Sequence, residues 1–329
     1  MNLRLKAAAL AAALVFALPM AQAKNFRMAL GDAQGGTQWE LGQKFAELFK
    51  AKTGGKHKIK MFANGQLGSE QDTINDAAIG SLDFSVLAIN NITPFSPTVG
   101  VMTLPYVIQS LDDAVKLTRG DVGKELTENT IRDARVRIIG WAYSGFRVLT
   151  NSKRPVKTLA DLDGLVIRVP KNEIMIATYQ AWGINPTPMA WSETFTALQQ
   201  GVVDGQDNPY ITNHAMKFYE VQKYITNIRY IFSLEPLVIS EDVFQSQKPE
   251  VQKAILEAGH EATLHSEAFI KASEADIKKA LQAKGMEISD PANDEKEWIE
   301  KATTAVWPKY YESIGGKDKL DHVLKVLGR

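Results

Sequence analysis

The sequence predicts an α/β protein of two lobes, joined by a hinge and braced by one long helix. Strand-like and helix-like segments alternate in the first third of the chain, and the same alternation restarts at residue 135. This alternation is typical of parallel sheets covered by helices on both sides. A helical pattern then continues over residues 249–284. Because no linker or low-complexity stretch separates the halves, we expect short hinge strands to cross between the lobes.

The first lobe begins with strands at "FRMAL" (26–30) and "HKIKMF" (57–62), with an amphipathic helix between them that ends near Gly54. Ser69 is suited to N-cap a second helix through "EQDTINDAAIG". The nearly continuous apolar run "LDFSVLAI" (82–89) is typical of a strand covered on both faces. This order predicts a parallel sheet.

The second lobe starts with a strand at "RVRIIGWAY" (135–143), followed by a strand in "GLVIRVP" (164–170). A helix over 172–182, a short strand at "PTPMA" and a helix over 192–200, capped by Ser192, complete the pattern. At 1.5 Å per residue, the helix predicted from residue 249 measures about 50 Å, which is longer than one domain is wide. We therefore expect it to contact both lobes.

The first 23 residues have the pattern of a secretory signal peptide. Arg4 and Lys6 form a basic start, residues 7–18 an apolar core, and Ala21-Gln22-Ala23 a small-residue cleavage site. The core has about 12 residues, whereas spanning a bilayer takes about 20. We expect cleavage near Ala23 and a mature protein in the periplasm that does not itself span a membrane.

Composition excludes several classes of function. Without Arg4 and Lys6, 36 basic residues remain against 38 acidic ones, a net charge of about −2. A nucleic-acid partner calls for a clustered basic excess, so we expect none. The chain has no cysteine, which excludes disulfides and thiolate metal sites. About 305 mature residues suggest two domains.

Enzyme and cofactor motifs are absent from the sequence. There is no G-x-S-x-G, P-loop or G-x-G-x-x-G. "HEATLH" is one residue too long for a zinc-protease helix, because His260 and His265 lie five apart and two ligands on one helix face need a spacing of four. We expect no metal and no cofactor.

Polar residues follow the predicted strands of the first lobe, where ligands bind in open α/β sheets. They are Asp32, Gln34 and Thr37 after the first strand, and Asn90 and Asn91 after the third. Their short side chains suit the recognition of hydroxyl groups. The alternative is that such residues merely form turns.

Two arginines stand out in the second lobe. Arg147 closely follows the strand that we expect to end at Tyr143, and Arg168 lies at the end of its own strand. Alternation places Arg168 on the same face as Val166, which is unremarkable if that face is in solvent. If both faces are covered, as the apolar run indicates, Arg168 reaches the crevice and offers bidentate recognition of a carboxylate.

The stretch "PMAWSETFTALQQGVVDGQDNP" (188–209) adds two candidates. Trp191 directly precedes a predicted helix and either walls a pocket or packs in the core. Asn208 lies at another strand end. Asp204 and Asp207 are interpreted as turn-forming residues rather than catalytic carboxylates.

These stretches resemble the solute-binding proteins of TRAP transporters, of the DctP type. The matching motifs cover nearly the whole mature chain in one order: "NGQLGSEQD", "GSLDFSV", "LPYV", "GFRVLTNSKRPVKTLADLDGLVIRVP", "NPTPMAWSETFTALQQGVVDGQDNP" and "KFYEVQKYI". The resemblance implies a two-lobe periplasmic binding protein fold, with lobe 1 at 24–145 plus about 234–273 and lobe 2 at 146–233 plus about 274–329. It also implies closure around an organic acid and delivery to small and large TRAP membrane subunits.

The resemblance assigns roles to particular residues. Arg168 matches the family arginine that binds the ligand carboxylate, and Arg147 matches a second family arginine. Asn208 and Trp191 match the family asparagine and aromatic residue. Members that bind sialic acid carry an acidic residue where this chain has Ala88 to Asn91, which makes a smaller hydroxylated acid the better expectation.

Several functional alternatives stay open. The ligand is expected to be a sugar acid, such as a uronate or an aldonate, or else a C4-dicarboxylate. A periplasmic receptor of another transport or sensory system is the first alternative. A secreted hydrolase or lyase using Asp204, Asp207 or His214 is the remote one.

Overall fold

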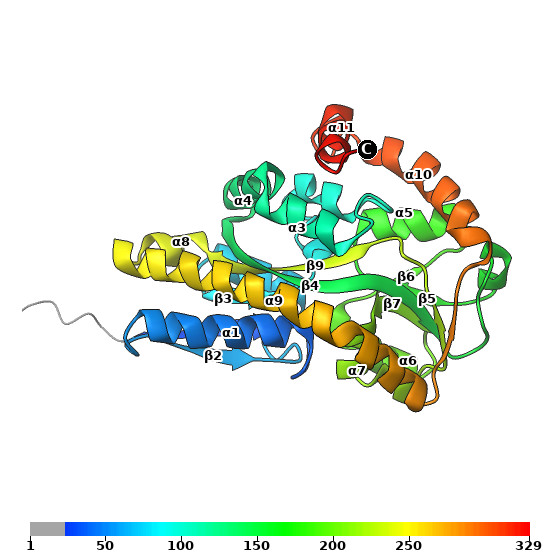
Figure 1. Ribbon diagram of the computed structural model, residues 1–329, viewed down its shortest axis with the longest axis horizontal. Helices are drawn as coiled ribbons and strands as arrows, with labels where there is room; N and C mark the ends of the chain where they lie inside the picture. The colour runs from blue at the N-terminus through cyan, green and yellow to red at the C-terminus, as the bar shows by residue number, and fades with distance from the viewer. Residues whose placement is uncertain (1–23) are drawn as a thin grey trace, which may run out of the picture.

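One mixed sheet of ten strands runs through both lobes (Figure 1). The computed structural model describes residues 24–329, so the predicted signal peptide lies outside the described residues. The strands follow the order β2-β1-β3-β9-β4-β7-β5-β6, and β8 pairs with both β4 and β10. Their bounds are β1 Asn25–Leu30, β2 Lys58–Phe62, β3 Phe84–Val86, β4 Val136–Asn151, β5 Ile167–Val169, β6 Thr187–Pro188, β7 Gly205–Pro209, β8 Tyr224–Thr226, β9 Phe232–Ser240 and β10 Glu287–Ser289.

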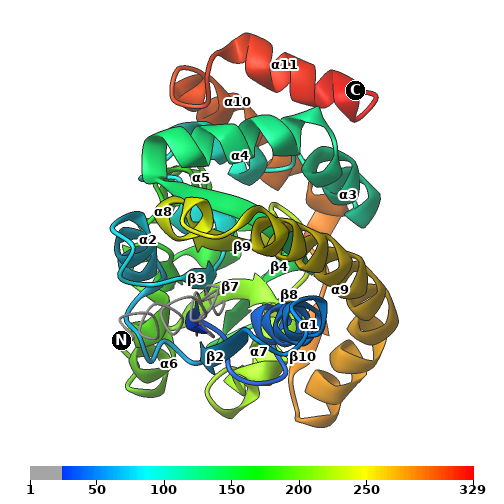
Figure 2. The same ribbon diagram turned by 90° about the vertical axis from the view of Figure 1, so that its left-hand side faces the viewer.

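Helices cover both faces of the sheet, with β4 and β9 lying between α4 on one side and α1 on the other (Figure 2). The helices are α1 Thr37–Lys52, α2 Glu70–Ala78, α3 Leu111–Arg119, α4 Asp121–Ala134, α5 Glu173–Ala181, α6 Trp191–Gln199, α7 Tyr210–Ala215, α8 Glu241–Gln245, α9 Pro249–Ala283, α10 Lys296–Tyr310 and α11 Lys317–Val326. The predicted two-lobe α/β architecture is confirmed.

The parallel sheet predicted for the first lobe is only part of the observed one. β1 pairs in parallel with β2 and β3, as predicted, and Ser69 caps α2 through a reciprocal pair of bonds with Asp72. β3, however, pairs antiparallel with β9, and β9 pairs antiparallel with β4. The strand alternation of the first third could not reveal β9, which comes almost 150 residues later in the chain.

The strands that connect the lobes are long. β4 does not end at Tyr143, as predicted, but is 16 residues long and ends at Asn151, so that Arg147 lies inside the strand. Its pairing with β9 shifts register twice, between Ile138 and Gly140 and between Tyr143 and Gly145. Such bulges bend a strand without ending it. The expectation of short hinge strands is therefore wrong.

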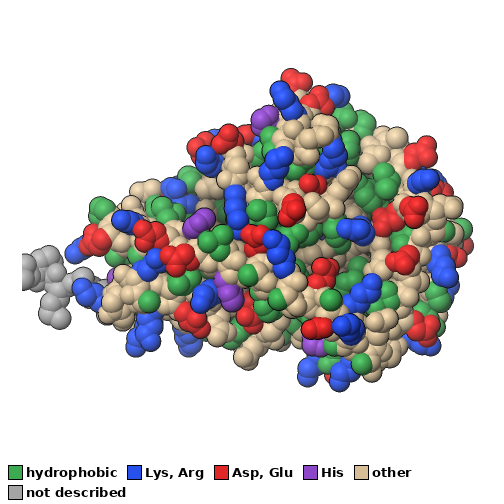
Figure 3. Space-filling view, in the orientation of Figure 1, with side chains coloured by type: hydrophobic (Ala, Val, Ile, Leu, Met, Phe, Trp, Pro, Cys, Tyr) green, Lys and Arg blue, Asp and Glu red, His purple; other side chains and the backbone are tan. Residues whose placement is uncertain are grey.

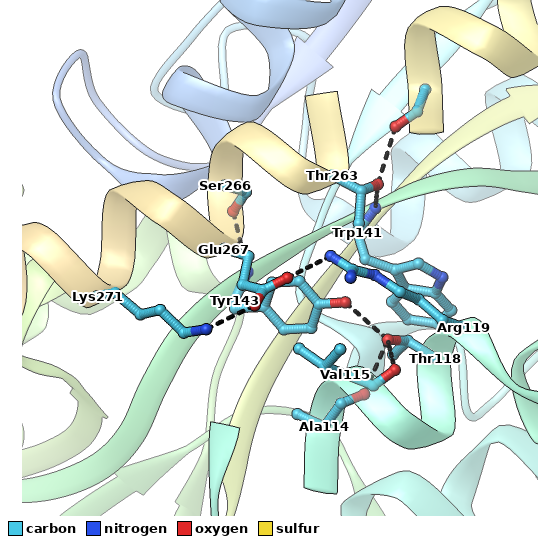
Figure 4. A network of polar contacts seen from close by, with 11 residues as sticks. Ala114, Val115, Thr118, Arg119, Trp141, Tyr143, Thr263, Ser266, Glu267 and Lys271 are labelled. Atoms are coloured by element: carbon cyan, nitrogen blue, oxygen red, sulfur yellow. Dashed lines mark hydrogen bonds and ion pairs between the residues drawn. The ribbon is translucent and has the colours of Figure 1, made fainter. Parts of the chain in front are cut away.

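Helix α9 matches the predicted long helix and is anchored to β4 where that strand bulges (Figure 4). The Thr263 hydroxyl accepts the Trp141 backbone N–H at 2.9 Å, and the Ser266 hydroxyl accepts that of Tyr143 at 3.2 Å. The helix approaches so closely that a Cβ on Gly259 would lie 2.0 Å from the Ile139 carbonyl oxygen. Side-chain hydroxyls thus replace the bonds that the bulged strand lacks.

Helix α9 contacts both lobes, as predicted. Its first half packs Ile255 and Ala258 against the core that contains Phe45 of α1. Near its far end, Leu281 packs with Val148 and Ile225. The helix therefore braces the lobes against each other along their common side, running obliquely across the molecule in Figure 1.

The C-terminal helices lie beside different parts of the fold. Trp298 of α10 packs on Trp182 at the end of α5, whereas Leu320 of α11 belongs to the same core as Leu117 of α3. The division of the chain at about residues 145, 234 and 273 stays a prediction.

The described surface offers neither a membrane span nor, on the face seen in Figure 3, a patch of a single charge. Acidic and basic side chains alternate over that face. Within residues 24–329, no helix combines the length and apolar character needed to cross a bilayer.

Candidate ligand-binding site

The predicted site residues converge on one small polar cavity between the lobes. Its walls include seven predicted residues: Arg168, Arg147, Asn208, Trp191, Asn90, Asn91 and Asp32. The other lining residues are Gln38, Glu70, Ala88, Pro170, Thr212 and Glu235. Its volume of about 20 Å³ accommodates one water molecule. An organic acid therefore enters only when the lobes move apart.

Gln34 and Thr37 are the two predicted site residues that do not line the cavity. The Gly36 N–H donates to the Ala33 carbonyl oxygen at 3.1 Å, and the tip of the resulting turn, including Gln34, is exposed. Gln38, in the first turn of α1, lines the cavity instead. A ligand contact by Gln34 therefore stays a prediction.

Arg168 lies in the middle of β5 and is 2% exposed. Its Nε and Nη2 donate to the Met189 carbonyl oxygen at 3.1 and 2.7 Å. No carboxylate of residues 24–329 forms an ion pair with it, and three of its five N–H donors have no acceptor there. Burial, with a smaller effect of the Arg147 charge, lowers the pKa of Arg168 to about 10. The guanidinium stays cationic, and the solvent interpretation of this residue is wrong.

Arg147, by contrast, has a carboxylate partner within the chain. Its Nε donates to Asp207 Oδ2 at 2.8 Å, and its Nη2 donates to the Asp207 carbonyl oxygen. The Tyr230 hydroxyl donates to the same carboxylate oxygen. Asp207 is fully buried in β7, so its interpretation as a turn former is wrong. Arg147 lines the cavity as one half of a neutral pair.

Asn208 follows Asp207 in β7 and belongs to a network of amides. Its Nδ2 donates to Gln206 Oε1 at 2.5 Å, and its carbonyl oxygen accepts from Asn213 Nδ2 at 2.9 Å. Nearby, the buried Thr212 hydroxyl has no partner among the described residues. The edge of the cavity at β7 therefore offers both an amide and a free hydroxyl.

Trp191 is the first residue of α6 rather than the residue before it, and the cap position belongs to Ala190 instead of Ser192. The Arg168 guanidinium lies 5.7 Å from the centre of the indole ring, within the range of a cation–π contact. Across the cleft, the indole Nε1 donates to the Gly31 carbonyl oxygen at 3.2 Å. Trp191 therefore contacts both the arginine and the opposite lobe.

Two further contacts join the lobes beside the cavity. Asn172 Nδ2 donates to the Asn90 carbonyl oxygen at 3.0 Å, and Gln71 Nε2 donates to the Lys171 carbonyl oxygen at 3.1 Å. Together with the Trp191 contact, these bonds hold the cleft closed.

Sequence analysis missed two buried acids of the cavity, Glu70 and Glu235. Glu70 begins α2 and accepts bonds from Gln38 Nε2, at 2.7 Å, and from Asn91 Nδ2. An acid in the first turn of a helix is common, which masked its significance. Glu235 interrupts the buried strand "FSLEPLVIS" as Arg168 interrupts its own strand, and that signal could have found it.

The acids of the cavity carry raised pKa values. Burial, followed by the charge of Glu70, raises the pKa of Asp32 to about 7. Burial and the charge of Asp32 raise the pKa of Glu235 well above its usual range. Burial also raises the pKa of Glu70, against its hydrogen bonds and the charge of Arg168. The first lobe and the crossing strand β9 thus supply a cluster of acids to the cavity.

Other features offer no competing centre. Within residues 24–329, no group of three or more metal-ligating side chains could hold a metal ion. A cavity of about 780 Å³ lies beside α9, lined by Phe146, Arg229 and Glu274 among others, but neither Arg147 nor Arg168 reaches it.

Comparison with known proteins gives one consistent result. A sequence model of the family described as "Bacterial extracellular solute-binding protein, family 7" matches residues 33–314. A TRAP periplasmic solute-binding protein from Rhodobacter sphaeroides, described as apo and open, is 37% identical, with a TM-score of 0.75 over 92% of this chain and 98% of its own.

Two ligand-bound structures are closer in shape although more distant in sequence. The sugar acid-binding protein of Advenella mimigardefordensis, in complex with galactonate, has a TM-score of 0.89 at 26% identity, over 93% of this chain and 98% of its own. A TRAP solute-binding protein of Roseobacter denitrificans with bound β-D-glucuronate has a TM-score of 0.85 at 27% identity, over 92% of this chain and 99% of its own. The closed cleft of this chain is thus more similar in shape to the two ligand-bound structures than to the structure described as open.

Proposed function

This chain belongs to family 7 of the bacterial extracellular solute-binding proteins, and from that premise we propose that it captures a sugar acid, an aldonate or a uronate, by closing its two lobes around it. The family consists of binding proteins rather than enzymes, so the hydrolase or lyase alternative is set aside. The predicted signal peptide supports a periplasmic location, and the family supports delivery to small and large TRAP membrane subunits. A sensory receptor would carry the same site; co-purification with the membrane subunits separates the two.

The observation that carries the proposal is the unpaired Arg168. A buried cation without a carboxylate partner is costly, and a ligand carboxylate would supply the missing partner. The three free N–H donors suit a bidentate contact with it. Arg147 cannot take this role in the same way because Asp207 already neutralises its charge.

The hydroxyl groups of a sugar acid would meet the remaining polar atoms of the cavity. Four buried atoms that line it lack a partner among the described residues: Asp32 Oδ2, Asn90 Nδ2, Thr212 Oγ1 and Glu235 Oε2. Buried polar atoms are almost always hydrogen-bonded, so these four mark places for ligand groups. The galactonate and glucuronate held by the two structural relatives have hydroxyls of this kind.

The test is ligand-dependent thermal stabilisation, measured with D-galactonate, D-glucuronate and a wider set of organic acids. We expect Arg168→Ala to remain folded and to weaken ligand binding about a hundredfold or more, because it removes two charge-assisted bonds worth about 1.5–3 kcal/mol each. Arg168→Lys is expected to restore little of the ligand binding, since the ammonium group of lysine cannot replace the planar, bidentate guanidinium group. Arg135→Ala, at an exposed arginine that lines neither of the cavities described above, is the matched control.

Two outcomes would contradict the proposal. Full stabilisation of Arg168→Ala by the ligand would exclude Arg168 as the anchor. If no aldonate or uronate stabilises the wild-type protein while another class of acid does, the sugar-acid assignment is wrong.

A further inference from the structure

The closed cavity has opposite electrostatic character on its two sides. Arg147 of β4 and Arg168 of β5 face it from the second lobe. Asp32 after β1 and Glu70 of α2 face it from the first lobe, and Glu235 faces it from the crossing strand β9. A ligand whose carboxylate lies at Arg168 therefore extends its other end toward three carboxyl groups.

Two of these carboxyl groups are incompletely paired. Glu70 accepts hydrogen bonds through both of its oxygens, from Gln38, Ala88 and Asn91. Asp32 Oδ2 and Glu235 Oε2 are buried without a partner among the described residues. The absence of a side chain at Gly36 leaves room for the Asp32 carboxyl group, because a Cβ at that position would lie 2.6 Å from Asp32 Oδ2. Asp32 and Glu235 thus line the cavity, and each has an oxygen without a hydrogen-bond partner in residues 24–329.

On the premise that the site binds a sugar acid, we propose that Asp32 and Glu235 form a proton-holding pair that recognises the hydroxyl end of the ligand and rejects any acid with a second carboxylate at that end. A hydroxyl both donates and accepts, so it satisfies a carboxyl group in either protonation state. A second carboxylate only accepts, and above about pH 7, where Asp32 is ionised, it would stand next to like charge in a buried site. That like-charge contact disfavours aldarates and also C4-dicarboxylates, the class that the sequence alone left open.

The pair also makes binding dependent on pH. In the open cleft the two acids are hydrated, and their pKa values return toward the ordinary range near 4. Closure buries them beside each other and beside Glu70, and raises the pKa of Asp32 to about 7. Closing around the ligand therefore takes up a proton between about pH 4 and pH 7. Affinity is highest at the acidic end of this window and falls as the pH rises, by up to about tenfold per pH unit for each proton taken up.

The experiment compares D-galactonate with galactarate, which has the same hydroxyl groups and a carboxylate at both ends. At pH 8.5, where Asp32 is ionised, isothermal titration calorimetry is expected to show galactarate binding at least a hundredfold more weakly than galactonate, and the difference is expected to narrow at pH 7.0 and 5.5. In buffers of different ionisation enthalpy at pH 5.5, galactonate binding is expected to take up at least one proton. Equal affinities for the two ligands at pH 8.5, or binding of galactonate without proton uptake at pH 5.5, would overturn the proposal.

Variants assign the effect to the pair. Asp32→Asn and Glu235→Gln keep the shape of the side chains and remove one ionisable group each. We expect both to narrow the difference between galactonate and galactarate and to reduce proton uptake, whereas Glu300→Gln, at an exposed position of α10, changes neither. Unchanged proton uptake in both cavity variants would overturn the assignment. Failure of every aldonate and uronate to bind the wild-type protein would instead contradict the proposed function, so the two failures are distinguishable.

Discussion

Two arginines of this protein are equally buried but differ in what neutralises them. Arg147 and Arg168 are each 2% exposed. Arg147 forms an ion pair with the carboxylate of Asp207, whereas Arg168 donates hydrogen bonds only to a backbone carbonyl among the described residues. One arginine is therefore part of the fold and the other is available to a ligand. Both look alike in the sequence, because the partner of Arg147 lies 60 residues away.

At the residue scale, Asp207→Asn is expected to destabilise the protein strongly. It leaves Arg147 buried without a countercharge, and breaking such a pair costs about 3–5 kcal/mol. Urea denaturation gives the free energy of unfolding. The control is Asp242→Asn, because the Arg135–Asp242 pair is more than half exposed and is worth at most about 1 kcal/mol. Equal losses in the two variants would show that Arg147 does not depend on Asp207.

At the scale of elements, the contact between β4 and α9 stabilises the bent strand that connects the two lobes. β7 and β8 pair with β4 only over residues 147–151, and Thr263 and Ser266 of α9 accept the N–H groups of Trp141 and Tyr143 in the part of the strand before them. The Arg119–Glu267 ion pair and the Tyr143–Thr118 hydrogen bond add contacts from α3 (Figure 4). The strand can therefore bend while its polar groups remain satisfied.

Thr263→Ala is expected to lower the free energy of unfolding by about 1–3 kcal/mol, because it leaves the buried Trp141 N–H without an acceptor. The measurement is chemical denaturation followed by circular dichroism. Thr304→Ala is the matched control, since that exposed hydroxyl bonds only to the Glu300 carbonyl oxygen of its own helix. A loss no larger than that of the control would mean that the Trp141 N–H finds another acceptor.

At the scale of the whole molecule, lobe closure joins two incomplete half-sites. The second lobe provides the cation and the first lobe the acids, and three side chain–backbone bonds cross the cleft beside them. A micromolar ligand needs about 8 kcal/mol, which is more than Arg168 can contribute alone. Affinity therefore depends on closure, and ligand binding shifts the equilibrium between open and closed forms.

Trp191→Phe tests this dependence. It keeps an aromatic ring near Arg168 but removes the hydrogen bond to Gly31, so we expect galactonate to dissociate about five- to tenfold faster, as the loss of about 1 kcal/mol implies. Stopped-flow fluorescence measures the rate. Trp307→Phe removes a comparable bond to the Pro105 carbonyl oxygen, away from the cleft, and is expected to leave the rate unchanged. An unchanged rate in Trp191→Phe would contradict a role for this bond in holding the closed form.

The sequence by itself determined the features that depend on neighbouring residues. The period of apolar residues predicted α9, the cap at Ser69 predicted the start of α2, and a charge inside an apolar strand marked Arg168. Glu235 is likewise a charged residue inside an apolar strand, but it was not predicted as a site residue. Only the tertiary structure decided the extent of β4, the pairing of Arg147 with Asp207 and the acidic side of the cavity. Strand pairing, burial and charge compensation bring together residues far apart in the chain, and no local pattern contains that information.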